Sequence, residues 1–295
     1  MNQEQLKHIG DGLGFIAALD QSGGSTPKTL KAYGVERNQY HSEEEMYQMI
    51  HQMRTRVITS QAFTNDKILG AILFENTMDR KINHMFTADY LWEVKKVVPF
   101  LKIDKGLADL ENGVQMMKPI PNLDALLDKA VERHIFGTKM RSVIKEANVK
   151  AIRQIVKQQF DIGLKIAKKG LVPIIEPEVD IHSKEKYLCE KYLREALLEA
   201  LIKCPKDMKV MLKLTLPDIA NFYESLIDDE HVLRVVALSG GYDREVANEK
   251  LAQNRQMIAS FSRALLQDLR FDQNDQSFDQ HLKQAIDSIY KASIA

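Results

Sequence analysis

Lys213 is the residue best suited to covalent chemistry, because it stands in an apolar run that is typical of a buried strand. The run is Val210-Met211-Leu212-Lys213-Leu214-Thr215-Leu216, too short and too apolar for a surface helix. An ammonium group buried in such a run costs several kcal/mol unless it is paired or loses its proton. A desolvated lysine with a lowered pKa is also the usual amine nucleophile near neutral pH. The sequence therefore predicts a Schiff-base enzyme.

Charged and small polar residues end other apolar runs in the same way. A single charged residue at a strand end is most often a solvated rim group, but a set that converges on one rim forms a mixed-charge pocket. Such a pocket can lower the pKa of one lysine and raise that of one carboxyl. The residues that end or follow these runs are Asp20, Glu75, Lys102, Asp104, Lys139, Arg141, Glu176, Glu178, Ser239, Gly240 and Arg263.

Glu176-Pro177-Glu178 places two carboxylates beside a proline. Proline cannot donate to a central ladder, so Pro177 predicts the exit of a strand at Glu176. Two neighbouring acids in different environments can take different roles, one as a general acid and base and the other as a partner of cations.

Two small-residue segments are typical of phosphate binding. Ser239-Gly240-Gly241 offers a hydroxyl and open backbone amides, and Arg263 follows the next predicted strand. The second segment, Gln21-Ser22-Gly23-Gly24-Ser25-Thr26-Pro27-Lys28, ends in a cation beside an expected helix start. Each segment alone could be a tight turn, but two on one rim favour a substrate with two phosphates.

The elements that must position these groups alternate between short apolar runs and longer amphipathic segments. Helix signals include a capping-box pattern from Ser42 and amphipathic segments over 146–167, 184–202 and 243–251. Predicted strands cover 15–20, 68–75, 100–104, 135–141, 171–176, 210–216, 233–239 and 257–262. Eight such runs predict an α/β fold, a TIM (β/α)8 barrel. No linker-like stretch divides the chain, so one domain over 1–295 is expected, with a short C-terminal helix near 277–290.

Composition excludes several classes of protein. The chain has 41 lysine and arginine residues and 41 aspartate and glutamate residues. Its formal net charge is therefore zero, and no overall electric field draws it to nucleic acid or an anionic membrane. The N-terminal sequence has no signal-peptide pattern and no apolar run reaches membrane-span length, so a cytoplasmic protein is expected. Cys189 and Cys204 are expected to be reduced, and the eight scattered histidines predict no metal site. We expect no cofactor and a small-molecule partner.

At this point several motifs together resemble class I fructose-bisphosphate aldolase, the Schiff-base type. The resemblance extends from about Gly14 to Leu265. The motifs, in the order typical of the family, are Ile16-Ala17-Ala18-Leu19-Asp20, Ile72-Leu73-Phe74-Glu75, Leu101-Lys102-Ile103-Asp104-Lys105-Gly106, Val172-Pro173-Ile174-Ile175-Glu176-Pro177-Glu178, Leu212-Lys213, Leu238-Ser239-Gly240-Gly241 and Arg263-Ala264-Leu265.

The resemblance implies reversible cleavage of fructose 1,6-bisphosphate to dihydroxyacetone phosphate and glyceraldehyde 3-phosphate, in glycolysis and gluconeogenesis. It implies that Lys213 forms the imine, Glu176 shuttles protons and Asp20 takes the C4-hydroxyl proton. It also implies that Lys139 stabilises developing charge and that Glu178 orients the lysines. The implied ketose-end phosphate site is Ser239, Gly240 and Arg263, and the rest of the sugar would contact Ser22, Ser25, Lys28, Lys102 and Arg141.

The sequence departs from the animal-type pattern at several positions. Gln21 stands in place of glutamate, Thr29 in place of a basic residue, Met140 in place of tryptophan and Ser262 in place of glycine. These departures bear most on the aldehyde-end phosphate, and the chain also lacks the longer tail with a terminal tyrosine. Animal relatives form tetramers, so a homo-oligomer is open, although no interface is readable here.

Three alternatives differ in substrate, catalyst or class. Another Schiff-base barrel enzyme, transaldolase-like or a deoxysugar-phosphate lyase, would use the same lysine on a different sugar. A zinc aldolase would need clustered metal ligands, which the histidine spacing does not supply. A scaffold protein with an inactive barrel is a different class, disfavoured by the presence of Asp20, Lys139, Glu176 and Lys213 together.

Overall fold

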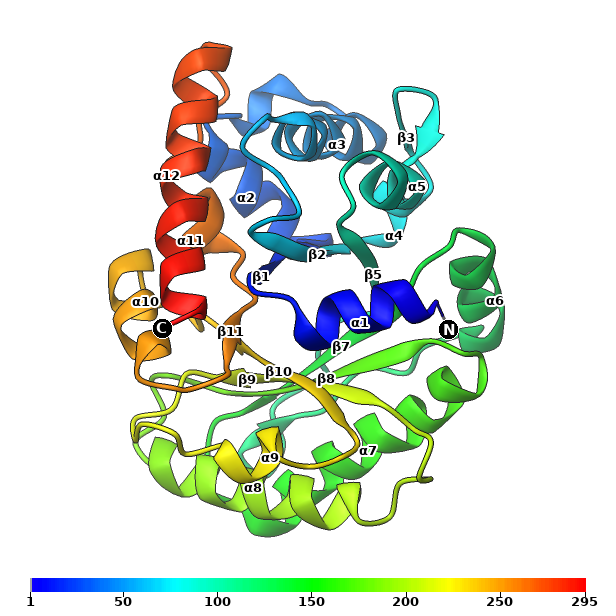
Figure 1. Ribbon diagram of the computed structural model, residues 1–295, viewed down its shortest axis with the longest axis vertical. Helices are drawn as coiled ribbons and strands as arrows, with labels where there is room; N and C mark the ends of the chain where they lie inside the picture. Colours follow the sequence, from blue (N-terminus) through cyan, green and yellow to red (C-terminus); the bar gives the residue numbers. More distant parts are fainter. Residues whose placement is uncertain (1) are drawn as a thin grey trace.

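The computed structural model describes residues 2–295 and shows eight parallel strands curved into a nearly closed barrel (Figure 1). The strands, in order around the barrel, are β1 (Phe15–Leu19), β2 (Ile68–Leu73), β5 (Val98–Lys102), β7 (Gly137–Ile144), β8 (Val172–Val179), β9 (Val210–Thr215), β10 (Val232–Leu238) and β11 (Ile258–Ala259). The barrel closes where the backbone N–H of Ala18 donates to the carbonyl of Phe261 at 3.1 Å, just after β11. The predicted (β/α)8 barrel is confirmed.

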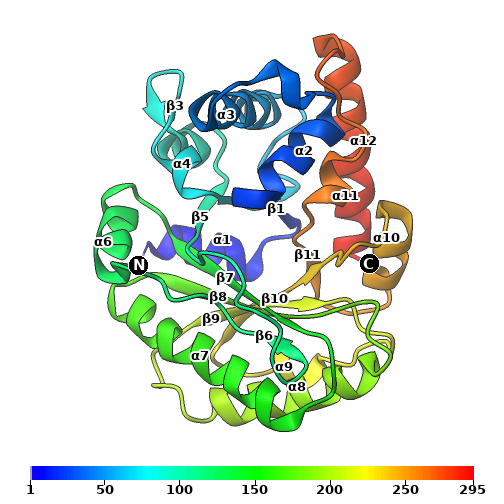
Figure 2. The ribbon, with the colours of Figure 1, turned by 180° about the vertical axis from the view of Figure 1, so that it is seen from behind.

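Helices follow the strands and lie around the barrel (Figure 2). They are α1 (Gln3–Asp11), α2 (Thr26–Tyr33), α3 (Glu43–Thr59), α4 (Glu75–Met78), α5 (Thr87–Asp89), α6 (Leu123–Glu132), α7 (Val149–Lys168), α8 (Lys186–Leu201), α9 (Glu224–Ile227), α10 (Arg244–Ala252), α11 (Arg263–Leu266) and α12 (Asp275–Ser293). Single turns occur at η1 (Gly23–Ser25), η2 (Arg37–Gln39) and η3 (Tyr90–Val94). Short strands β3 (Lys81–Ile82) and β4 (Met85–Phe86) form a hairpin, and β6 (Val114–Gln115) pairs with β7.

Side-chain caps explain where several helices begin. Ser42 accepts the backbone N–H of Glu45 at the start of α3, as the capping pattern predicts. Asn148 caps α7 and Asn274 caps α12 in the same manner. The closing helix α12 spans 19 residues and is tied to β11, since Ser293 Oγ accepts the backbone N–H of Ala259 at 3.1 Å.

The interior of the barrel changes chemistry along each strand. Inward positions near the amino ends hold a buried apolar cluster that includes Phe100, Ile174 and Met211. Two residues further along the same strands the inward positions hold Lys102, Glu176 and Lys213. Because side chains alternate with a period of two, both layers belong to the same inward rows.

Helix α1 lies across the amino end of this interior, where Figure 1 shows it in front of the strands. Its Ile9 is fully buried in the apolar cluster. Arg234 of β10 donates to the carbonyls of Ile9, at 2.9 Å and 3.0 Å, and of Gly10 and Gly12, which satisfies groups at the C-terminal end of α1. The amino end is thus closed by apolar packing, and the carboxyl end holds the polar groups.

Two sequence expectations about strand ends differ from the structure. The strand expected to end at Glu176 continues through Pro177 to Val179. The pairing of β8 with β9 ends at Ile175. A proline at 177 therefore removes no backbone hydrogen bond between these two strands. Glu75, expected at the end of a strand, begins α4 and pairs with Lys105 at 2.8 Å on the surface.

Other expectations concern the cysteines and the membrane. Cys189 and Cys204 are both free, and Cys189 is buried on α8. Among residues 2–295 no helix combines the length and apolar character that a membrane crossing requires.

Candidate active site

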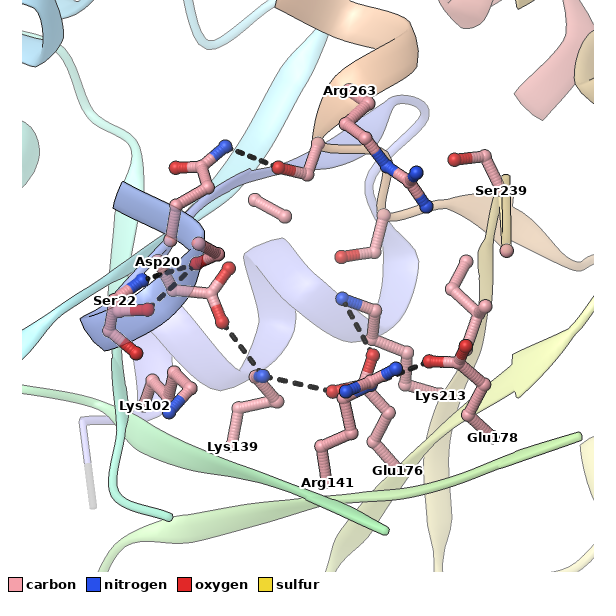
Figure 3. A pocket seen from close by; sticks show the side chains of 17 residues that line it. Asp20, Ser22, Lys102, Lys139, Arg141, Glu176, Glu178, Lys213, Ser239 and Arg263 are labelled. Carbon is pink, nitrogen blue, oxygen red and sulfur yellow. Dashed lines mark hydrogen bonds and ion pairs between the residues drawn. The ribbon is translucent and has the colours of Figure 1, made fainter. Parts of the chain in front are cut away.

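A polar cavity of about 220 Å³ opens at the carboxyl ends of the strands (Figure 3). It brings together nearly all the residues predicted from strand ends, although they come from β1, β5, β7, β8, β9, β10 and the segment after β11. Predicted residues that line it are Asp20, Ser22, Ser25, Lys102, Lys139, Arg141, Glu176, Glu178, Lys213, Ser239, Gly240 and Arg263.

The ion-paired side chains of the cavity floor form a charged layer of Asp20, Lys102, Asp104, Lys139, Glu176 and Lys213. Glu176 lies at its centre and contacts two lysines at once. Its Oε1 is 3.2 Å from Nζ of Lys213, and its Oε2 is 3.0 Å from Nζ of Lys139. All three side chains are at most 5% exposed. Figure 3 shows Glu176 between the two amines. A carboxylate in this place can pass a proton to or from either amine without solvent.

Asp20 and Asp104 complete a network of opposite charges around Lys139. Asp20 lies 2.7 Å from Lys139 and Asp104 lies 3.9 Å from it, while Lys102 pairs with Asp104 at 2.8 Å. With Lys213 and Glu176 this gives three cations and three anions, so the buried charges compensate one another.

The network fixes the protonation of its members. Burial alone would raise the pKa of Asp20, but Lys139 and Lys213 outweigh it and hold that pKa well below its usual range. Burial alone would lower the pKa of Lys139, yet Asp20 and Glu176 raise it well above its usual value. The cavity therefore offers a carboxylate that stays ionised at neutral pH beside a fixed cation.

Glu178 contacts an arginine of the cavity. Its Oε2 accepts from Nε of Arg141 at 2.6 Å, and within residues 2–295 it forms no ion pair with a lysine. Burial would lower the pKa of Arg141, but the bond to Glu178 raises it above its usual value. Glu178 thus orients a guanidinium at the cavity wall.

The segment after β10 combines a hydroxyl with two glycines. Gly240 and Gly241 have φ of +63° and +123°, a backbone region that favours glycine. A Cβ on Gly240 would also lie 2.7 Å from Cγ2 of Ile181. Nearby Arg263, at the start of α11, forms no ion pair in the described chain. Open amides, Ser239 and this cation together suit a phosphate.

The segment after β1 is held by its own serines. The backbone N–H of Ser22 donates to Oγ of Ser25 at 2.9 Å, and that hydroxyl donates to the carbonyl of Ser22 at 2.8 Å. Ser22 and Ser25 reach the polar cavity. Lys28 instead lines a neighbouring, more apolar cavity of about 490 Å³, which shares Ser25 and Arg263 with the first.

Sequence reasoning missed Ser260 and named Gln21 and Ser262 without making them contacts of the substrate. All three line the cavity, and the side chain of Gln21 donates to Ser262. The hydroxyl of Ser260 is buried with no hydrogen-bond partner within residues 2–295. The alternation of Ser260 and Ser262 just before Arg263 is the signal that could have found them, because i and i+2 share a face.

Arg54 was missed without any such signal. It is fully buried on α3 and donates to Oγ1 of Thr77 at 2.6 Å and to the carbonyl of Gln21 at 2.5 Å. Burial lowers the pKa of Arg54 to about 10, although Asp20 and Tyr47 act to raise it. Arg54 supports the backbone that joins Asp20 to Ser22. Among the described residues, no cluster of three or more histidine, cysteine, aspartate or glutamate side chains could hold a metal ion.

Comparisons with known proteins identify the family of the chain. Over residues 3–221 the chain matches the family model described as fructose-bisphosphate aldolase class-I. It is 58% identical over 294 residues, covering all of both chains, to the fructose-bisphosphate aldolase class 1 of Clostridium acetobutylicum.

Solved structures share the fold at lower identity. The fructose-bisphosphate aldolase of Plasmodium falciparum, solved with TRAP and a small-molecule inhibitor, is 19% identical with a TM-score of 0.74, over 98% of this chain and 93% of that one. A protein of Corynebacterium glutamicum is 11% identical with a TM-score of 0.53, over 99% and 92%. The family match and the full-length relative show that this chain belongs to the class I fructose-bisphosphate aldolases, which are metal-independent lyases.

Proposed function

We propose that the chain reversibly cleaves fructose 1,6-bisphosphate to dihydroxyacetone phosphate and glyceraldehyde 3-phosphate through a Schiff base on Lys213, in glycolysis and gluconeogenesis. The observation that carries this proposal is the carboxylate of Glu176, 3.2 Å from the Lys213 amine and 3.0 Å from that of Lys139. A nucleophilic amine, a proton shuttle and a fixed cation are the groups that imine chemistry needs.

In the first half-reaction Lys213 adds to the C2 carbonyl of the ketose. Starting from its ammonium form, Lys213 gives one proton to Glu176 before the attack and a second one after it, and Glu176 passes both in turn to the C2 oxygen, which leaves as water. The product is a protonated imine. Lys139 carries a fixed positive charge, since Asp20 and Glu176 raise its pKa, and it stabilises the oxygen as negative charge develops.

In the second half-reaction Asp20 removes the proton from the C4 hydroxyl. The C3–C4 bond breaks, its electron pair enters the imine to give an enamine, and the aldehyde product leaves. Protonation of the enamine at C3 and addition of water then release the second product and the free amine. The lowered pKa of Asp20 keeps it ionised as a base throughout neutral pH.

Two groups of residues would hold the phosphates. Ser239, Gly240 and Arg263 would bind the phosphate at the ketose end, because they offer a hydroxyl, open amides and a cation that is unpaired within residues 2–295. The rest of the sugar and its other phosphate would contact Ser22, Ser25, Lys28, Lys102 and Arg141.

Borohydride trapping tests the covalent step. Incubation of the protein with dihydroxyacetone phosphate and sodium borohydride should attach one substrate-derived group to Lys213, located by peptide mass mapping. A label on another residue, or no label in a protein that is folded, would overturn the proposal. Lys102 provides an internal control, because it lies in the same cavity and should remain unlabelled.

A further inference from the structure

Gln159 is a buried polar residue outside the cavity that reaches the backbone of the site. It lies on α7 and is fully buried, which is uncommon for glutamine. Its Nε2 donates to Oγ of Ser142 on β7 at 3.0 Å, and its Oε1 accepts the backbone N–H of Glu176 on β8 at 2.8 Å. Because the amide of Glu176 is a donor, the orientation of the Gln159 side chain is determined.

The backbone of β8 stays paired with β7 through Val179, but on its β9 side it has few other anchors at this level. Its register with β9 ends at Ile175, and Pro177 has no N–H to donate. On the β9 side the next hydrogen bonds to the β8 backbone also come from a side chain. Thr215 Oγ1 accepts from the N–H of Val179 at 2.9 Å and donates to its carbonyl at 2.7 Å. Between these points the N–H of Glu176 is held by Gln159.

The hydrogen bond between Gln159 and the backbone of Glu176 affects the direction in which the Glu176 carboxylate points. Its two oxygens lie 3.2 Å from Lys213 and 3.0 Å from Lys139, so a small rotation of the backbone would lengthen one contact or both. A displacement of about 1 Å at a catalytic group can reduce a rate by roughly a hundredfold.

We propose that Gln159 is a positioning residue for the reaction: from the outer helix it fixes the backbone of Glu176, and so aims the proton shuttle at the Schiff-base lysine. This inference rests on the proposed function, because it assigns Gln159 a part in the same imine formation. Gln159 itself does not line the cavity, and among residues 2–295 its side chain bonds Ser142 and the backbone of Glu176.

The chain contains a matched control next to Gln159. Gln158, also on α7, is half-buried and makes two hydrogen bonds, accepting from the backbone N–H of Met117 and donating to its carbonyl, each at 3.0 Å. Gln158→Leu therefore removes the same functional group and the same number of bonds, but leaves the backbone of Glu176 untouched.

The test compares kcat and KM for cleavage of fructose 1,6-bisphosphate, together with the rate of borohydride inactivation in the presence of dihydroxyacetone phosphate. In Gln159→Leu we expect kcat and the rate of imine trapping to fall together by roughly tenfold to a hundredfold, with KM nearly unchanged. Gln158→Leu should keep both rates of the wild type. Thermal melting of each variant establishes the folded fraction to which the rates are normalised.

Gln159→Leu leaves two buried polar groups unpaired, so a second variant keeps the test open if that protein does not fold. Gln159→Glu retains an acceptor for the N–H of Glu176, and the hydroxyl of Ser142 can turn to donate to it. It should recover a substantial part of the lost kcat and of the trapping rate.

Three results would overturn the inference. They are equal kcat in the two leucine variants, a rise in KM without loss of kcat, and a Gln159→Glu variant no better than a folded Gln159→Leu. The wild-type protein separates this failure from failure of the proposed function: cleavage and a Lys213 adduct in the wild type keep the latter intact whatever Gln159 does.

Discussion

The two ends of the barrel interior are made by the same strands and have opposite properties. At the amino end Phe100 is fully buried and packs edge to face on Phe136, with ring centroids 5.5 Å apart. Two residues later on the same strand, Lys102 pairs with Asp104 in the polar cavity. A step of two residues spans only about 7 Å along a strand. Packing and chemistry are therefore separated by a single step along each inward row.

Stability and reactivity have separate sources in the barrel interior. The apolar layer is the cluster at the amino end that includes Phe100, Ile174 and Met211. Its burial removes hydrocarbon from water and stabilises the fold. The charged layer costs desolvation, which its three cations and three anions offset only because they compensate one another. Substitutions in the two layers should accordingly separate activity from stability.

The largest expected effect is on activity in the charged layer. Lys213→Met should reduce cleavage of fructose 1,6-bisphosphate on the order of a millionfold, the size found when a covalent catalyst loses its nucleophile. Glu176 keeps Lys139 as a partner, so the fold should survive. A coupled aldolase assay with thermal melting measures both. Residual activity near that of the wild type would show that the charged layer does not supply the nucleophile.

Next in size is a loss of stability in the apolar layer. Phe100→Ala should lower the free energy of unfolding by about 3–5 kcal/mol, because it leaves a cavity in the amino end. Urea denaturation measures this change. The kcat of the folded fraction should stay close to that of the wild type, and a large fall in kcat would show that the two layers are not separable.

A smaller effect is the dependence of stability on pH, which belongs to the charged layer alone. The pKa of Asp20 is lowered in the folded state, so its contribution is fully present above its unfolded pKa of about 3.9 and is lost as pH falls through the folded value. The pKa of Lys139 is raised, so its contribution is present below about 10.4 and is lost as pH rises through the folded value.

The free energy of unfolding should therefore decline outside a window from about pH 4 to about pH 10. Urea denaturation across this range checks the prediction. In the double variant Asp20→Asn with Lys139→Met both declines should be weaker, whereas Phe100→Ala should retain them. Identical pH dependence in the wild type and the double variant would contradict it.

The smallest expected effect is on the KM for a substrate with two phosphates. Lys28 lines the neighbouring apolar cavity, and in the proposed function it contacts the phosphate at the aldehyde end. Lys28→Met should raise KM for fructose 1,6-bisphosphate by a few fold, about 1 kcal/mol at most for an exposed charge pair. KM for fructose 1-phosphate should not change. An equal effect on both sugars would place Lys28 elsewhere in the mechanism.

Much of the fold could be predicted because parallel strands covered by helices must be continuously apolar. That requirement makes the eight runs readable, and the caps at Ser42 and Asn148 act locally. The extension of β8 through Pro177 could not be predicted in this way. Proline is tolerated there because pairing with β9 has already ended, which is a property of the neighbouring strand.

The candidate site divides in the same manner. Lys213, Glu176 and Asp20 could be found because each charge interrupts or ends an apolar run. Gln159 and Arg54 could not, because a polar residue on a helix is ordinarily taken as part of its solvated face. Their partners lie on other elements, Glu176 on β8 and Gln21 in the segment after β1, at separations of 17 and 33 residues.

The amino-acid sequence was enough to predict the barrel, the family and most of the charged residues that line the polar cavity. How these residues pair depends on the folded barrel, which sets Glu176 between Lys213 and Lys139, Glu178 beside Arg141 and Lys28 outside the polar cavity. The two outcomes differ because the interactions behind them act over different separations along the chain. Apolar periodicity and capping act between residues close along the chain, whereas ion pairs and pKa shifts depend on distances set by closure of the whole barrel.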